Sequence, residues 1–148
     1  MTRRVLVTEA LAPSGLELLQ KACDVTVRLN PPPDELLQII GDYHGLIVRS
    51  STQVTEAVLA AGSQLMVVGR AGTGVDNIDL EAATRHGIVV VNAPTGNTAA
   101  VAEHTMALML ALARHVCDAN VGMHAGRWDK KHLMGSELRG KTLGLVGL

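Results

Sequence analysis

The segment that indicates how the chain folds is Val67-Val68-Gly69-Arg70-Ala71-Gly72-Thr73-Gly74-Val75-Asp76-Asn77. An apolar run over residues 65–68 leads into its glycines, and a helix-forming stretch follows from Asp79 to residue 86. A strand, a glycine-rich turn and a helix in this order present backbone N–H groups to an anion. The glycines let the backbone approach a ligand closely, and Arg70 adds a permanent positive charge. We therefore predict a site for a small anion at this turn.

The same turn nearly matches the dinucleotide-binding pattern G-x-G-x-x-G, but it departs from that pattern in two ways. Asn77 stands where the third glycine belongs, and Asp76 would bring negative charge towards a pyrophosphate. The P-loop pattern of nucleotide-binding proteins ends in Gly-Lys-Ser/Thr. No such residues follow this turn, so that pattern does not match either. The predicted ligand of this turn is therefore a small anion and not the phosphates of a cofactor.

Composition and charge exclude several classes of protein. Of the 148 residues, 47 % are hydrophobic and 18 % are charged, which is typical of a globular chain with a full core. The formal net charge of −1 argues against nucleic acid or a membrane surface as a partner. Cys23 and Cys117 suit a reducing compartment, and no signal peptide precedes the first predicted strand. We therefore expect a cytoplasmic protein.

Short apolar runs alternate with helix signals, which predicts an α/β fold with a parallel sheet. Strands are expected at residues 5–8, 25–27, 45–48, 65–68 and 88–91. Helices are expected from Pro13, over 34–40 with Gly41 at its end, over 56–61 between Thr55 and Gly62, and from the cap Asp79 to Gly87. Because crossovers between parallel strands are right-handed, we expect a flavodoxin-like strand order 2-1-3-4-5 for a domain of residues 1–95.

A second unit is predicted from residue 96 to residue 148. Its longest helix should run from Thr98 to about Cys117, and its middle is so apolar that it should be buried on all sides. Glu103 and His104 interrupt the apolar run, so no membrane span is expected. Residues 140–148 indicate a buried strand, and its Gly147 should begin a tight turn.

Polar groups follow the third and fourth predicted strands, which are neighbours in the expected order. Arg49 and Ser50 come after one strand and Arg70 after the other, so the two guanidinium groups should lie side by side at the carboxyl edge. This arrangement suits a clamp for a phosphate or carboxylate; the alternative is that each arginine pairs with a nearby acid, Asp76 or Glu9. Thr73 could contact a ligand or cofactor, or could bond to its own backbone.

Other catalytic patterns are missing from the sequence. The six histidines show no metal-ligand spacing, so no metal site is predicted, and no Gly-x-Ser-x-Gly pattern is present. A basic stretch at residues 127–131 is typical of a solvated face, although Trp128 within it suggests an interface.

Four motifs together resemble the D-isomer-specific 2-hydroxyacid dehydrogenases. They are Ile47-Val48-Arg49-Ser50, the segment from Gly69 to Asn77, Asn92-Ala93-Pro94-Thr95-Gly96-Asn97 and Gly140-Lys141-Thr142-Leu143-Gly144. The resemblance implies that residues 1–95 form most of a substrate domain and that residues 96–148 begin a Rossmann NAD-binding domain. It also implies a homodimer or homotetramer, with the long apolar helix at the subunit interface.

The resemblance also assigns roles to individual residues. Those expected to bind substrate are Arg49, Ser50, Arg70, Gly72, Thr73, Gly74 and Lys130. Thr73 would also lie near the nicotinamide of NAD, and Gly147 would begin the dinucleotide fingerprint. In related sequences a basic residue near Lys130 reaches the substrate of the partner subunit; lysine keeps the charge there but lacks the fork of arginine.

The family's catalytic arginine, glutamate and histidine would lie beyond Leu148, so residues 1–148 alone should be inactive. The two adjacent arginines favour a phosphorylated 2-hydroxy acid as substrate. One alternative is a dehydrogenase for another D-2-hydroxy acid, in which Arg49 would be structural. The other is a non-catalytic module that binds a small phosphorylated metabolite.

Overall fold

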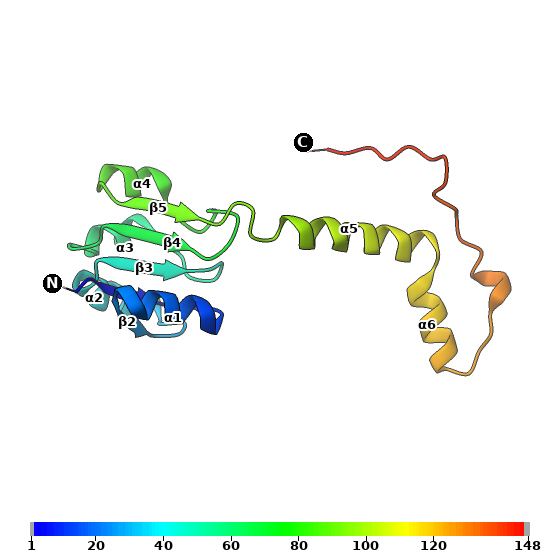
Figure 1. Cartoon of the computed structure of the whole chain (residues 1–148), viewed down its shortest axis with the longest axis horizontal. Coiled ribbons are helices and arrows are strands. Elements are labelled where there is room, and N and C mark those ends of the chain that lie inside the picture. Colours follow the sequence, from blue (N-terminus) through cyan, green and yellow to red (C-terminus); the bar gives the residue numbers. More distant parts are fainter. Residues whose placement is uncertain (1, 147–148) are drawn as a thin grey trace. The chain divides into compact units, whose positions relative to one another are not determined.

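The computed structural model describes residues 2–146, and the chain forms two compact units, Met1–Asn97 and Thr98–Leu148. The sequence predicts this division between residues 95 and 96. Unit 1 (Met1–Asn97) contains a five-stranded parallel sheet in the order β2-β1-β3-β4-β5, so the predicted order is confirmed (Figure 1). The strands are β1 (Arg4–Val7), β2 (Asp24–Val27), β3 (Gly45–Val48), β4 (Val67–Arg70) and β5 (Val89–Asn92).

The register of the sheet aligns the carboxyl ends of its last three strands. Val48 of β3 lies opposite Arg70 of β4, and Arg70 lies opposite Asn92 of β5. The loops that leave these strands therefore begin at the same edge of the sheet, as the predicted order requires.

The helices of unit 1 begin and end close to the predicted residues. They are α1 (Pro13–Ala22), α2 (Pro33–Ile39), α3 (Glu56–Ala61) and α4 (Leu80–Arg85). Asp79 caps α4 by accepting a hydrogen bond of 2.9 Å from the N–H of Ala82. Gly87 follows α4 with a φ of +68°, which explains a glycine there. Gly41 does not end α2 as predicted, because a 3-10 turn, η1 (Ile40–Asp42), continues the helix through it.

The core of unit 1 lies between the sheet and the row of helices in which α3 contacts both α2 and α4. It is aliphatic, as the composition predicts, with Tyr43 as its one aromatic side chain. The largest side chains that are completely or almost completely buried include Leu6, Ile40, Leu46, Leu59, Val48 and Val68.

Unit 2 (Thr98–Leu148) corrects two predictions. The long helix divides into α5 (Thr98–Ala113) and α6 (Val116–His124), because His115 adopts a left-handed φ of +53° that a continuous helix does not permit. Residues 141–146 form no strand. A strand needs a hydrogen-bonded neighbour, and all strands among residues 2–146 belong to unit 1.

Helix α5 is apolar, yet none of its residues is buried within unit 2. Leu108 and Leu112 expose 57 % and 81 % of their surfaces. A short 3-10 turn, η2 (Lys130–His132), follows α6. Among the helices of residues 2–146, none combines the length and the apolar character needed to cross a lipid bilayer.

Candidate functional site

The candidate site consists of the loops at the carboxyl edge of the sheet in unit 1. The loop after β3 carries Arg49 and Ser50, and the glycine loop (residues 71–77) follows Arg70 at the end of β4. The Nε of Arg70 donates a hydrogen bond of 3.1 Å to the carbonyl oxygen of Arg49. The two loops are therefore adjacent, whereas the side-by-side placement of the two guanidinium groups stays a prediction.

Arg70 is held by its own loop. Besides the contact with Arg49, its guanidinium donates to the carbonyl oxygen of Gly74 at 2.6 Å and to Asp76 Oδ1 at 3.1 Å. Only 9 % of the Arg70 side chain is exposed, whereas Asp76 is 79 % exposed. A Cβ at Gly74 would lie 2.8 Å from Asp76 Oδ1, so a side chain there would push the Asp76 carboxylate away from its contact with Arg70. The pairing of Arg70 with a nearby acid, one of the two alternatives from the sequence, is present.

Arg49 has very different surroundings. Its side chain is exposed, and its guanidinium makes one long hydrogen bond of 3.4 Å, to the carbonyl oxygen of Ala10. Glu9, the acid that the sequence offered as its partner, instead accepts from the backbone N–H of Arg49 at 2.8 Å. Arg49 therefore keeps most of its donors and its charge available at the edge of the sheet, next to the exposed Ser50.

The glycine loop exposes backbone donors. Within residues 2–146, the N–H groups of Thr73, Gly74 and Val75 donate to no other group. Thr73 Oγ1 bonds to Asn97 Oδ1 at 2.7 Å, and the side chain of Asn92 donates to the carbonyl oxygen of Thr73 at 2.6 Å. The Thr73 hydroxyl is thus tied to the segment after β5 and not to its own backbone. Consecutive free N–H groups of this kind suit an anion.

Sequence reasoning missed the role of Glu9, which lies two residues after the end of β1. Only 7 % of Glu9 is exposed, and its carboxylate accepts from the N–H groups of Arg49, Ser51 and Thr52 at 2.8, 3.1 and 3.0 Å. Burial acts to raise the pKa of this carboxyl, but the three backbone donors outweigh burial and lower its pKa to about 2. A charged residue immediately after an apolar strand was the available signal.

The two other buried polar residues among residues 2–146, Thr8 and Asn77, contact the same loop. Thr8 Oγ1 lies 2.9 Å from Thr52 Oγ1. Asn77 Nδ2 donates to the carbonyl oxygens of Arg49 and Thr52 at 2.9 and 2.7 Å. Asn77, which stands where the dinucleotide pattern has its third glycine, therefore supports the loop after β3. Together with Glu9, these side chains hold residues 49–52 through hydrogen bonds.

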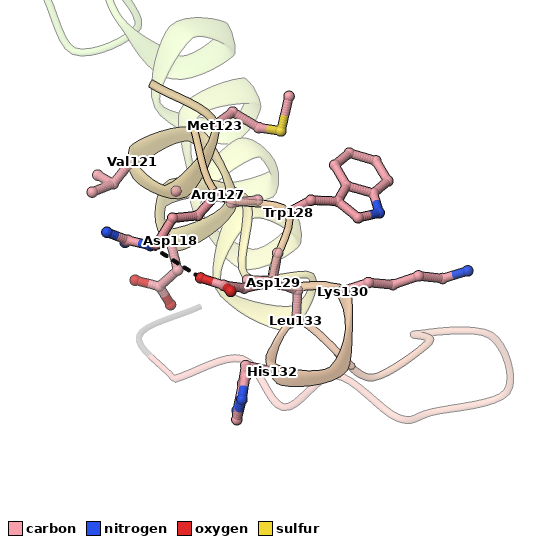
Figure 2. Close-up of a pocket in the computed structure, with 11 residues that line it drawn as sticks. Asp118, Val121, Met123, Arg127, Trp128, Asp129, Lys130, His132 and Leu133 are labelled. Carbon is pink, nitrogen blue, oxygen red and sulfur yellow. Dashed lines mark hydrogen bonds and ion pairs between the residues drawn. The ribbon is translucent and has the colours of Figure 1, made fainter. Parts of the chain in front are cut away.

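Lys130, the remaining predicted substrate residue, lies in unit 2 at the start of η2. It borders a hollow of about 530 Å³ that α6 and the segment after it enclose. Figure 2 shows the Lys130 side chain extending away from the ion pair in which Arg127 Nε meets Asp129 Oδ2 at 3.1 Å. Lys130 is exposed, like Trp128 beside it, so its ammonium group is accessible.

The dinucleotide fingerprint is not complete within residues 2–146. Gly147, predicted to begin the fingerprint, lies outside residues 2–146. The glycine loop of unit 1 contains Asp76, which pairs with Arg70, and an acid there opposes a pyrophosphate. Of the predicted cofactor residues, Thr73 alone can be placed, and its hydroxyl bonds to Asn97. In residues 2–146, no three His, Cys, Asp or Glu side chains cluster as metal ligands would.

Comparison with known proteins adds to this geometry. The family model described as "D-isomer specific 2-hydroxyacid dehydrogenase, catalytic domain" matches residues 5–141. A relative from Synechocystis sp., named D-3-phosphoglycerate dehydrogenase, is 48 % identical over 145 residues, which are 98 % of this chain and 26 % of the relative. The chain thus spans about a quarter of the length of that relative.

Solved structures share the fold. The TT0316 protein of Thermus thermophilus is 34 % identical with a TM-score of 0.83, over 93 % of this chain and 46 % of that one. A 3-phosphoglycerate dehydrogenase of Entamoeba histolytica with bound NAD+ is 30 % identical with a TM-score of 0.68, over 77 % of this chain and 40 % of that one. The family match covers most of the chain, and the sheet with its edge loops supports it. This chain therefore belongs to the D-isomer specific 2-hydroxyacid dehydrogenases.

Proposed function

We propose that this chain is the substrate-side portion of an NAD-dependent D-3-phosphoglycerate dehydrogenase, which oxidises 3-phosphoglycerate to 3-phosphohydroxypyruvate in serine biosynthesis. The observation that carries the proposal is the carboxyl edge of the sheet, where Arg49 lies beside free backbone donors. The similarity to the Synechocystis sp. enzyme over nearly the whole chain supports the same substrate.

The site offers two kinds of anion binding, and the substrate has two anionic groups. The free N–H groups of Thr73 and Gly74 would bind one group, and the side chains of Arg49 and Ser50 would bind the other. Arg70 would support the glycine loop and add positive charge beneath it. Gly72 belongs to this loop as well, where a Cβ would lie 3.2 Å from an Arg70 guanidinium nitrogen.

The proposal includes NAD as cofactor and a homodimer or homotetramer as assembly, in which Lys130 would reach the substrate of the partner subunit. When bound, NAD would accept the hydride; the residues placed here bind and orient the substrate. The apolar surface of α5 supports self-association. The cytoplasmic location stays a prediction from the two cysteines.

The test compares 3-phosphoglycerate with D-glycerate, which lacks the phosphate, on the complete protein that contains this sequence. We expect Arg49→Ala to raise KM for 3-phosphoglycerate by about 10- to 100-fold, the range expected for a lost charge-assisted hydrogen bond. KM for D-glycerate should change less than KM for 3-phosphoglycerate. The matched control is Arg28→Ala, because Arg28 is an exposed arginine that pairs with Glu35 in the same unit.

Two outcomes would contradict the proposal. Equal turnover of both acids, with no effect of Arg49→Ala, would favour a dehydrogenase for another 2-hydroxy acid. Binding of 3-phosphoglycerate without any turnover by the complete protein would favour the non-catalytic module.

A further inference from the structure

All three buried polar side chains among residues 2–146 act on one short loop. Thr8, Glu9 and Asn77 expose 0 %, 7 % and 5 % of their surfaces, and each bonds to the backbone or side chain of residues 49–52. Burying a polar group costs stability unless it is fully bonded, so this concentration needs an explanation. The loop is exposed and contributes little to the aliphatic core, so core packing does not supply one.

Glu9 is the charged member of the three. Its two oxygens accept three backbone N–H groups, from Arg49, Ser51 and Thr52. The backbone N–H groups of the loop therefore converge on an anion, and that anion is the carboxylate of Glu9 itself. A second anion from solution cannot use these three N–H groups, so it must bind to other groups of the loop.

The pattern of bonds leaves suitable groups free. The carboxylate bonds to the backbone of Arg49 and not to its guanidinium, so the positive charge of that side chain is not used within the loop. Ser50 is the one residue of the turn whose N–H does not donate to Glu9 or to any other group in residues 2–146. Its N–H and hydroxyl lie in the exposed part of the turn.

We propose that Glu9 is a positioning residue, which holds residues 49–52 so that Arg49 and Ser50 are presented to an anionic group of the substrate. This inference rests on the proposed function, since it needs a substrate that Arg49 binds. Glu9 does not touch the substrate; it acts through the backbone of the loop.

The test is a double-mutant cycle in the complete protein, with Glu9→Gln, Arg49→Ala and the double variant. Glutamine has nearly the same shape, but its NH₂ group faces one backbone N–H and its charge is absent. We expect Glu9→Gln to raise KM for 3-phosphoglycerate about tenfold, with kcat and KM for NAD within about twofold. In the Arg49→Ala background the same change should have little further effect, because Glu9 acts through Arg49.

A control separates positioning from general destabilisation. Ile40→Val removes a methylene from a fully buried side chain of η1, away from the loop, and should lower Tm without changing KM. If Glu9→Gln does not fold, Glu9→Asp keeps the charge and takes its place in the cycle, with the same expected coupling to Arg49.

The outcomes are distinct. An unchanged KM in the Glu9 variant, or equal effects with and without Arg49, would overturn the positioning role while the proposed function stands. A wild-type protein that does not turn over 3-phosphoglycerate would overturn the proposed function, and with it this inference.

Discussion

Arg49 and Arg70 carry the same charge at the same edge of the sheet, but their surroundings differ. Arg70 is nearly buried and has three acceptors within hydrogen-bond distance. Arg49 is exposed and makes one long contact. The guanidinium of Arg49 would lose few hydrogen bonds within the protein when it binds a ligand. Arg70 would have to break hydrogen bonds that shape the glycine loop. At the residue scale, Arg49 is therefore the better candidate for substrate recognition.

Glu9 should make stability depend on pH in the acid range. Its pKa is about 2 in the folded chain against an ordinary value of 4.5, so it stabilises the folded state above pH 4.5 by roughly 3 kcal/mol. This contribution is lost as the pH falls from 4.5 towards 2. In the complete protein, we expect the urea midpoints of wild type and Glu9→Gln to converge over this interval. A difference that stays constant from pH 5 to pH 2.5 would contradict the assignment.

At the scale of elements, two glycines should respond oppositely to alanine. Gly87 ends α4 with φ +68°, so Gly87→Ala should destabilise by about 1 kcal/mol through backbone strain alone, since nothing lies within 4 Å of the added methyl. Gly15 lies inside α1, also with open space around it, and Gly15→Ala should stabilise by about 0.5 kcal/mol. Urea unfolding of the complete protein measures both. Changes of the same sign would contradict this account.

The elements of unit 1 could be predicted because their signals are local. Apolar runs, prolines at helix starts and the cap Asp79 lie within a few residues of the structures they determine. The break at His115 carries no glycine or proline, so the sequence did not indicate it. Residues 141–146 have the composition of a strand, but a strand also needs a partner, which composition does not report.

The part of the candidate site that depends only on strand order could be predicted from the sequence. Arg49 and Arg70 follow neighbouring strands, and that was enough to bring their loops together. Glu9 contacts residues about 40 positions away, and its distances to three N–H groups depend on the detailed course of the loop. No spacing rule covers such a contact, so its role became visible only in the structure.

At the scale of the whole molecule, the two units differ in how they bury apolar surface. Unit 1 encloses a core between its sheet and helices, whereas α5 of unit 2 buries none of its residues within its own unit. Exposed apolar surface of this kind marks an interaction site. We expect this helix to be covered in the complete protein.

Leu112→Glu tests whether a second subunit provides that cover. Leu112 is 81 % exposed on α5, so the substitution should spare unit 2 itself but place a charge in the interface. We expect light scattering of the complete protein to show the oligomer dissociating to single polypeptides. Glu103→Gln on the same helix is the control and should leave the oligomer intact. A wild-type mass of one polypeptide, or an oligomer that persists in Leu112→Glu, would contradict self-association.

The buried polar side chains around residues 49–52 also restrict how this protein can evolve. Replacing Thr8, Glu9 or Asn77 alone leaves its hydrogen-bonding partner unsatisfied. Each unsatisfied group lowers the free energy of unfolding by about 1–3 kcal/mol. Evolution away from this arrangement by single substitutions therefore passes through intermediates of lower stability. We expect these three positions to change together and to accept substitutions more slowly than the aliphatic core, where one aliphatic residue can replace another.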